Sequence, residues 1–165
     1  NMDFAIEAYF SEKDIVPIWT IVGAAHSVAH DLLQKQKPNE TFAHLSANAN
    51  KTTVRETLYT FRKTPNWLKH ADKDAESTLE ICNSDLEHKM FLTILDLGRL
   101  FPTSIKHSNE ASTFQLWYIA KYKATFGSPE YSNLVEAAYK VFPDLDKKSQ
   151  IEQLNAGNKI LKNAN

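Results

Sequence analysis

The sequence has few of the residues that cross-link a chain or divide it into short loops. Its 165 residues include a single cysteine, Cys82, which excludes an internal disulfide and a cluster of thiolate metal ligands. A lone cysteine fits a reducing compartment, and we expect a cytoplasmic protein. Four glycines and six widely spaced prolines leave room for long, uninterrupted elements of secondary structure.

Long apolar runs and a strong charge of one sign are also missing. No apolar stretch approaches the length of about 20 residues that a membrane-spanning helix needs, and the first residues predict no signal peptide. We therefore expect no membrane association. The 19 cationic side chains are balanced by 20 anionic ones, and only Arg55, Arg62 and Arg99 are arginines. This balance disfavours a dedicated nucleic-acid binder, because phosphate contacts depend on a basic surface.

The apolar residues that are present recur with a helical period, and no segment alternates as a strand does. The pattern predicts an all-α protein: one domain over residues 1–165, folded as a bundle of six to seven helices. The expected helices are 2–10, 15–36, 53–64, 84–101, 113–126, 130–142 and a weaker one over 146–161, which Gly157 interrupts. Phe114, Trp117 and Tyr118 share one helical face, which predicts that they lie in the core.

Several boundaries have their own signals. Asp14 is a suitable N-cap for the second helix, with Pro17 in the first turn. Thr53–Glu56 and Ser84–Glu87 both have the spacing of a capping box. Pro65 is expected to interrupt the third helix.

Two stretches between the expected helices have a different character. Residues 38–51 are polar or small and predict a loop. Residues 78–81 have a faint strand character, too short to build a sheet.

Two histidines in "GAAHSVAHDLL" are candidate metal ligands. His26 and His30 are one helical turn apart, so both imidazoles can face one divalent metal, with Asp74 as a further ligand. The spacing matches that of the metalloprotease helix, but Ser27 stands where that motif has glutamate. The alternative is a semi-buried, hydrogen-bonded pair beside Trp19, because His26 falls within the apolar stripe.

The stretch "NWLKHADKD", residues 66–74, is the second candidate site. A carboxylate at Asp72 could reach the His70 ring, fix its tautomer and raise its basicity, as a general base requires. The structural alternative is that Asp72 or Asp74 caps a turn while Trp67 anchors the segment to the core.

The two stretches "AIEAYFSEKDIVPIWTIVGAAHSVAHDLL" and "PNWLKHADKD" resemble the HEPN superfamily of small helical bundles. The resemblance covers roughly residues 3–100 and implies an up-and-down helical core, here with extra C-terminal helices. Asn66 and His70 match the family's Arg-Asn-x-x-x-His motif, whereas Pro65 occupies the position of its arginine. The second stretch also resembles a recurrent segment of bacterial proteins, a likeness that implies no function.

In catalytic members of that superfamily the arginine and histidine act together on an RNA phosphodiester, usually across a dimer. The resemblance implies that His70, with Asn66, could act as general acid or base, and that a cation would stabilise phosphoryl charge. Pro65 carries no charge, so Arg62 or Lys69 would have to take that role. Non-catalytic members serve as interaction or nucleotide-sensing modules.

Three hypotheses follow from the sequence. The first, which we favour because Pro65 replaces the arginine, is a HEPN-like interaction or sensing module without robust catalysis, forming a homodimer or binding a protein partner. The second is a ribonuclease-like enzyme that uses His70 with Arg62 or Lys69. The third is a metal-dependent hydrolase, whose divalent metal is held by His26 and His30 with residues from the His70, Asp72 and Asp74 turn.

Overall fold

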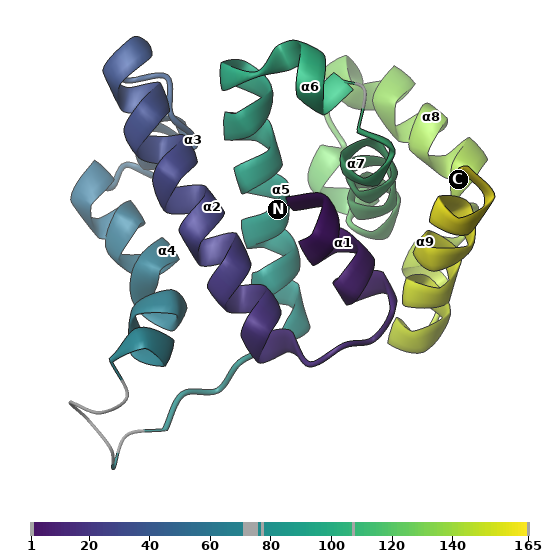
Figure 1. The fold of residues 1–165 in the computed structure, drawn as a ribbon. Coiled ribbons are helices and arrows are strands. Elements are labelled where there is room, and N and C mark those ends of the chain that lie inside the picture. The colour runs from purple at the N-terminus through teal and green to yellow at the C-terminus, as the bar shows by residue number, and fades with distance from the viewer. Residues whose placement is uncertain (1, 71–75, 77, 107, 165) are drawn as a thin grey trace. The chain divides into compact units, whose positions relative to one another are not determined.

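The computed structural model describes residues 2–70, 76, 78–106 and 108–164. Within these ranges all regular structure is helical: nine α-helices, three short 3₁₀ helices and no strand (Figure 1). The prediction of an all-α protein is confirmed. Two of the nine α-helices, α3 (Phe42–Asn50) and α6 (Pro102–Lys106), were not expected from the sequence.

The helices pack in two compact units. The first unit is built from residues 14–104, and the second from residues 3–13 together with 105–164. The organisation of residues 1–165 as one domain stays a prediction.

The first unit contains α2 (Ile15–Gln36), α3, α4 (Val54–Lys69) and α5 (Asn83–Leu100). Figure 1 shows α2 lying between α4 and α5, and α3 packs against α4. Its buried apolar side chains come mainly from one stripe on each of the two long helices: Ile18, Trp19, Val22, Ala29 and Leu33 on α2, and Leu86, Met90, Phe91 and Ile94 on α5. Apolar burial along these two stripes is what holds the unit together.

The boundaries of α2 agree with the sequence signals. The Asp14 carboxylate accepts the Val16 backbone N–H at 3.0 Å, and Pro17 occupies the first turn, where its missing N–H costs nothing. The helix ends at Gln36, two residues before Pro38. A side-chain cap therefore marks the start of α2, and a proline follows its end.

The expectation that Pro65 interrupts the third helix is wrong, because α4 continues through Pro65 to Lys69. A proline inside a helix leaves the carbonyl four residues earlier without its usual donor. Here that carbonyl belongs to Phe61, and it accepts a hydrogen bond from the Lys89 ammonium of α5. The Pro65 ring is buried against Gly23 of α2, where an added Cβ would lie 2.7 Å from the proline Cβ and Cγ. Neighbouring helices therefore support the interrupted turn.

The expectation of a loop over residues 38–51 is also wrong, because α3 forms there. Thr41 caps this helix by accepting the His44 N–H, and Ala43 and Ala47, one turn apart, are its buried residues. Two alanines give too weak an apolar signal for sequence analysis to identify the helix. Its start is tied to α5, since the Phe42 N–H donates to the Asp96 carboxylate at 2.9 Å.

The start of α5 is a third correction. The helix begins at Asn83 with Cys82 as N-cap and no side-chain cap, so Ser84–Glu87 is no capping box. Both residues lie inside the helix, and Glu87 is buried. Residues 78–82 have no regular secondary structure, so the faint strand character there is not realised.

The capping box at Thr53 is confirmed. The Thr53 N–H donates to the Glu56 carboxylate at 2.8 Å, and the Glu56 N–H donates to the Thr53 hydroxyl at 3.1 Å. We expect Thr53→Ala to lower the free energy of unfolding by about 1 kcal/mol, because helix donors lose their acceptor. Ser84→Ala, in the box that the sequence wrongly predicts, should change it by less than about 0.5 kcal/mol. Urea unfolding of both variants measures the difference, and equal losses would contradict the assignment of the cap.

The second unit contains α1 (Met2–Phe10), α7 (Asn109–Lys121), α8 (Ser132–Val141) and α9 (Gln150–Ala164). The connections between the last three are formed by the 3₁₀ helices η2 (Lys123–Phe126), η3 (Pro129–Tyr131) and η4 (Leu145–Lys147). The predicted helix over 113–126 is therefore an α-helix followed by a 3₁₀ turn.

An aromatic core holds the second unit together. Phe10 of α1 packs edge-to-face on Trp117 of α7 with ring centroids 5.4 Å apart, and Phe114 lies 6.0 Å from Phe10. The Trp117 indole N–H donates to the Gln153 backbone carbonyl at 2.7 Å. The prediction that the aromatic face of this helix lies in the core is confirmed for Phe114, Trp117 and Tyr118.

Gly157 does not interrupt the last helix, contrary to expectation. It lies inside α9, and a Cβ added there would lie 2.4 Å from the Phe10 ring. The glycine therefore permits the close approach of α1 and α9 within the second unit.

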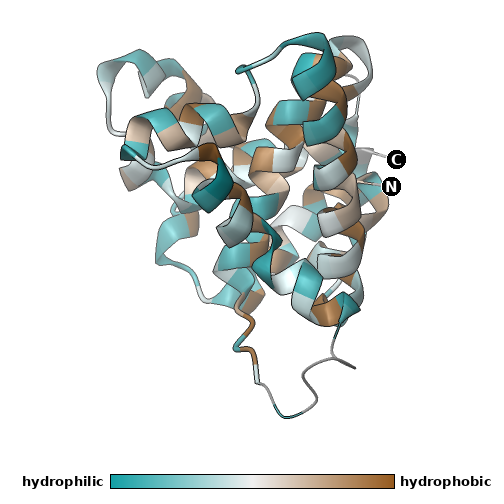
Figure 2. Ribbon diagram, turned by 90° about the vertical axis from the view of Figure 1, so that its left-hand side faces the viewer, coloured by the Kyte–Doolittle hydropathy of each residue, from teal (hydrophilic) through white to brown (hydrophobic). Residues whose placement is uncertain are grey.

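Polar and apolar residues mix along the helices throughout the described chain. Figure 2 shows brown and teal residues alternating along the helices, with none of them brown over its whole length. Among the described residues, no helix combines the length and the apolar character needed to cross a membrane.

Candidate functional site

Five ionisable side chains gather between α2, α4 and α5. His26 and His30 come from α2, Arg62 from α4, and Lys89 and Asp96 from α5. Four of them are buried, with residue exposures of 1% for His26, 6% for His30, 4% for Lys89 and 0% for Asp96. We call these five residues the buried polar cluster. Ionisable groups are rarely buried without a partner or a role, so the cluster is the strongest candidate site in the first unit.

Lys89 is held in place by Phe61 of the neighbouring helix. Its ammonium donates to the Phe61 carbonyl that Pro65 leaves without a helical donor, and lies 5.4 Å from the centroid of the Phe61 ring. Burial, and then the positive charge of Arg62, lower the pKa of Lys89 to about 7. Among the described residues no carboxylate forms an ion pair with Lys89. The lowered pKa places part of the amine in its neutral form at neutral pH, which gives Lys89 both cationic and nucleophilic character.

His26 lies beside this lysine in an apolar setting. Its ring packs edge-to-face on Phe61 with centroids 5.7 Å apart, and neither ring nitrogen has a hydrogen-bond partner among the described residues. Burial lowers the pKa of His26 to about 3, and the nearby charges of Lys89, His30 and Arg62 act in the same direction. The imidazole is consequently neutral at all moderate pH values.

The other three members of the cluster are His30, Asp96 and Arg62. Asp96 connects the cluster to the start of α3. Burial and the charge of Arg62 lower the pKa of His30. Burial raises the pKa of Asp96, although Oδ1 accepts hydrogen bonds from the Phe42 N–H and from Arg99 at 3.1 Å. Arg62 is half-buried and pairs with the exposed Asp31 at 3.6 Å.

A cavity of about 270 Å³ adjoins the cluster. We call it the Lys89 pocket; its walls come from α2, α4 and α5 and are Trp19, Thr60, Phe61, Thr64, Asp85, His88, Lys89 and Leu92. The four residues from α5 follow the spacing of one helical face. Trp19 is buried, and its indole N–H has no acceptor among the described residues. The pocket therefore combines an aromatic and aliphatic wall with the side chains of Lys89 and Asp85.

The residues of the HEPN-like motif lie away from this pocket. His70 is the exposed C-cap of α4, and its backbone N–H donates to the Asn66 carbonyl at 3.1 Å. Asn66 and Lys69 are exposed in the last turn of the same helix. Arg62 stands eight positions before His70, which corresponds to about 12 Å along a helix axis. Within one chain Arg62 and His70 do not converge on one phosphate.

The structure brings the two predicted metal-ligating histidines together, and the described residues supply no third ligand. The rings of His26 and His30 stack with centroids 6.2 Å apart and planes 17° apart. In the part of the chain that the structure describes, no group of three or more His, Cys, Asp or Glu side chains could hold a metal. The predicted ligand Asp74 and the predicted catalytic residue Asp72 lie outside the described residues. Hydrogen bonds to the ring nitrogens of His26, expected in the alternative interpretation, are not found among the described residues.

The two histidines and Arg62 were predicted as site residues from the sequence, whereas Lys89, Asp85 and His88 were not. A weak signal was present, since Lys89, Thr93 and Asp96 follow one another at spacings of four and three along the margin of the apolar stripe of α5. Pro65 was the other signal. A proline inside a helix leaves the carbonyl four residues earlier, here that of Phe61, without its helical donor.

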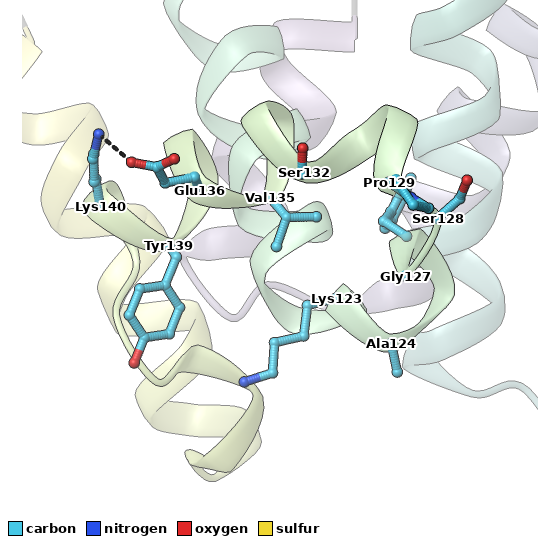
Figure 3. Close-up of a pocket in the computed structure, with 11 residues that line it drawn as sticks. Lys123, Ala124, Gly127, Ser128, Pro129, Ser132, Val135, Glu136, Tyr139 and Lys140 are labelled. Atoms are coloured by element: carbon cyan, nitrogen blue, oxygen red, sulfur yellow. Dashed lines mark ion pairs between the residues drawn. The ribbon is translucent and has the colours of Figure 1, made fainter.

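The second unit has a larger and more open cavity of about 660 Å³ between η2, η3 and α8. Figure 3 shows Lys123, Val135 and Tyr139 around it, with Glu136 and Lys140 joined by an ion pair of 2.7 Å. Lys123 pairs with Asp146 at 2.9 Å. Because these charged groups have partners, the cavity offers mainly apolar surface and no buried ionisable group, and we place the candidate site in the first unit.

Comparison with known proteins gives no match from which a function of the site could be inferred. The chain matches no family model, no curated protein and no solved structure.

Proposed function

We propose that the chain is a ligand-sensing module with a HEPN-like helical core, which binds a small molecule in the Lys89 pocket and has no robust catalytic activity. The observation that carries the proposal is Lys89 itself. A buried ammonium that lines a cavity and has only a neutral carbonyl as its hydrogen-bond partner is an unsatisfied recognition group for an acceptor.

The walls of the pocket indicate the size and chemistry of the ligand. A cavity of about 150 Å³ is enough for benzene, so about 270 Å³ admits one ring with a short substituent. Trp19, Phe61 and Leu92 suit the ring, while Lys89 suits an oxygen acceptor such as a carboxylate. The ligand class is thus a small, ring-sized molecule with an oxygen head group.

The same geometry suggests how binding is sensed. A ligand that accepts a hydrogen bond from the Lys89 ammonium draws it away from the Phe61 carbonyl. That carbonyl then has neither a helical nor a side-chain donor. The loss of this hydrogen bond destabilises the turn of α4 that contains Pro65. This turn lies directly before Asn66 and His70. Ligand binding and the conformation of this helix end are therefore coupled through one hydrogen bond.

The other two hypotheses have less support. A ribonuclease-like site needs His70 and a cation at one phosphate. Arg62 stands eight positions before His70 and pairs with Asp31, and Lys69, although next to His70, lacks the planar fork of arginine. A metal-dependent hydrolase needs a third ligand beside His26 and His30, and the described residues supply none.

Benzoate is a suitable probe for the proposed site. We expect a saturable change in the indole N–H resonance of Trp19, assigned with a Trp19→Phe variant, in a ¹H–¹⁵N NMR titration. Leu92→Trp, which fills the pocket, should abolish the change, whereas Leu45→Trp on the exposed side of α3 should not. An unsaturable change, or one that persists in Leu92→Trp, would contradict the proposal.

The affinity for benzoate should depend on pH through Lys89. The anion binds the ammonium form, and the pKa of Lys89 is about 7, so we expect about tenfold weaker binding at pH 8 than at pH 6. Lys89→Arg, which stays charged, should remove this dependence if it still binds. Equal affinities of the wild-type protein at both pH values would show that Lys89 does not contact the anion.

A further inference from the structure

We infer that the Lys89 pocket captures a small aldehyde covalently, as an imine on the Lys89 amine. The inference rests on the proposed function, because it names a ligand class for the same site. It rests on three features of the first unit: an amine on a residue that lines a cavity, the lack of an ion pair to that amine among the described residues, and a cavity wall that bears a carboxylate and an imidazole.

The first feature is the position of the amine. Lys89 is buried, yet it is one of the residues that line the cavity, so a molecule inside the pocket meets its side chain. Its hydrogen-bond acceptor is a backbone carbonyl and not a carboxylate. A neutral amine loses little by leaving such an acceptor, whereas an ammonium in a buried ion pair would stay protonated and unreactive.

The second feature is the electrostatic setting. Arg62 is the charged group that acts on Lys89 besides burial, and both favour the neutral amine. Desolvation and a neighbouring cation are the two means by which lysine becomes a nucleophile for carbonyl compounds. At pH 7 an exposed lysine with a pKa of about 10.4 has roughly a thousandfold less neutral amine than Lys89.

The third feature is the wall formed by α5. Asp85 lies one turn before Lys89 on the same face, and His88 lies next to it, so an exposed carboxylate and an exposed imidazole line the cavity that Lys89 also lines. The His88 Nδ1 is hydrogen-bonded to the Ser84 carbonyl, an arrangement in which Nδ1 donates and Nε2 is the basic nitrogen. Either group can accept a proton and return it.

The reaction balances without a redox partner. The amine lone pair attacks the carbonyl carbon, a C–N bond forms, and the carbonyl oxygen becomes a hydroxyl as the nitrogen loses a proton. Loss of that hydroxyl with the second amine proton releases one water and leaves a C=N bond. The wall of α5 moves the protons between nitrogen and oxygen, and nothing is oxidised or reduced.

Benzaldehyde is the probe, with cyanoborohydride as a reagent that traps the imine as a stable benzylamine. At pH 7 we expect one benzyl group per chain, located on Lys89 by peptide mapping, with a rate at least about tenfold above that of any other lysine. Lys89→Arg should abolish this labelling and Leu92→Trp should suppress it. Lys63→Arg, at an exposed lysine of α4, should leave it unchanged.

The outcomes separate this inference from the proposed function. Labelling spread over surface lysines, or labelling of Lys89 that survives Leu92→Trp, would overturn the inference. If Lys89 is not labelled while benzoate still gives its saturable shift, the pocket binds ligands but captures no aldehyde. If both experiments fail in protein whose helical circular dichroism is intact, the proposed function falls as well.

Discussion

Replacing His26 with leucine is expected to make the protein much more resistant to acid. The pKa of His26 is about 3 in the folded state, against about 6.5 in an unfolded chain. Between these values the unfolded state binds a proton that the folded state does not, so the wild-type protein loses stability as the pH falls from 6.5 to 3. The loss is on the order of 4 kcal/mol for a group buried as completely as His26. Leucine cannot be protonated and avoids it.

Urea unfolding at pH 7, 5.5 and 4 measures this effect. We expect His26→Leu also to be at least as stable as the wild-type protein at pH 7, because both ring nitrogens are buried without partners among the described residues. His70→Gln, at an exposed histidine of the same unit, is the matched control and should keep the acid sensitivity. If His26→Leu loses as much stability as the wild-type protein between pH 7 and pH 4, His26 is not the buried neutral group described here.

Gly23→Ala is expected to destabilise the first unit by about 2 kcal/mol, although alanine normally favours a helix over glycine by about 1 kcal/mol. The sign reverses because the added Cβ would lie 2.7 Å from two carbons of the buried Pro65 ring. To make room, α4 must move away from α2, and the Phe61 carbonyl moves with it away from Lys89. The substitution should therefore also weaken the binding of benzoate.

A matched glycine and a double-mutant cycle test this explanation. Gly127→Ala, where the new Cβ meets only the Ala124 carbonyl at an ordinary 3.5 Å, should change the free energy of unfolding by less than about 0.5 kcal/mol. In a Pro65→Gly background, Gly23→Ala should cost much less than in the wild-type protein. An equal cost in both backgrounds would show that the contact with Pro65 is not the cause.

Much of the helical framework could be predicted from sequence because its signals are local. Asp14 caps the start of α2 with its side chain, and Pro17 and Pro38 mark its ends through their restricted backbone. The capping box at Thr53 needs only residues of its own turn. The aromatic face of α7 was predictable for a related reason, since large side chains repeat at helical spacing.

The errors fall where a distant residue decides the outcome. Pro65 predicts a helix break from sequence. The helix continues because Lys89, 24 positions later, donates to the Phe61 carbonyl and because Gly23 leaves space for the proline ring. Gly157 is retained inside α9 because the Phe10 ring lies against it. Helix α3 was not predicted because its buried residues are two alanines, which give a weak apolar signal.

The candidate site shows the same division. Two histidines one helical turn apart have the spacing of metal ligands, so His26 and His30 were predicted as site residues. Lysine is usually exposed, so Lys89 was not. Nothing near Lys89 in the sequence shows that its acceptor is the carbonyl of another helix. The chemistry of the site arises from this tertiary contact.

The pKa of the Lys89 ammonium tests the central claim most directly. It can be measured by NMR titration of lysine labelled with ¹³C at Cε, with Lys89→Arg to assign the resonance. We predict a midpoint at about pH 7, as burial and the charge of Arg62 require. A midpoint near 10.4, the value of an exposed lysine, would contradict the account, because Lys89 would then be neither buried nor a reactive amine in a pocket.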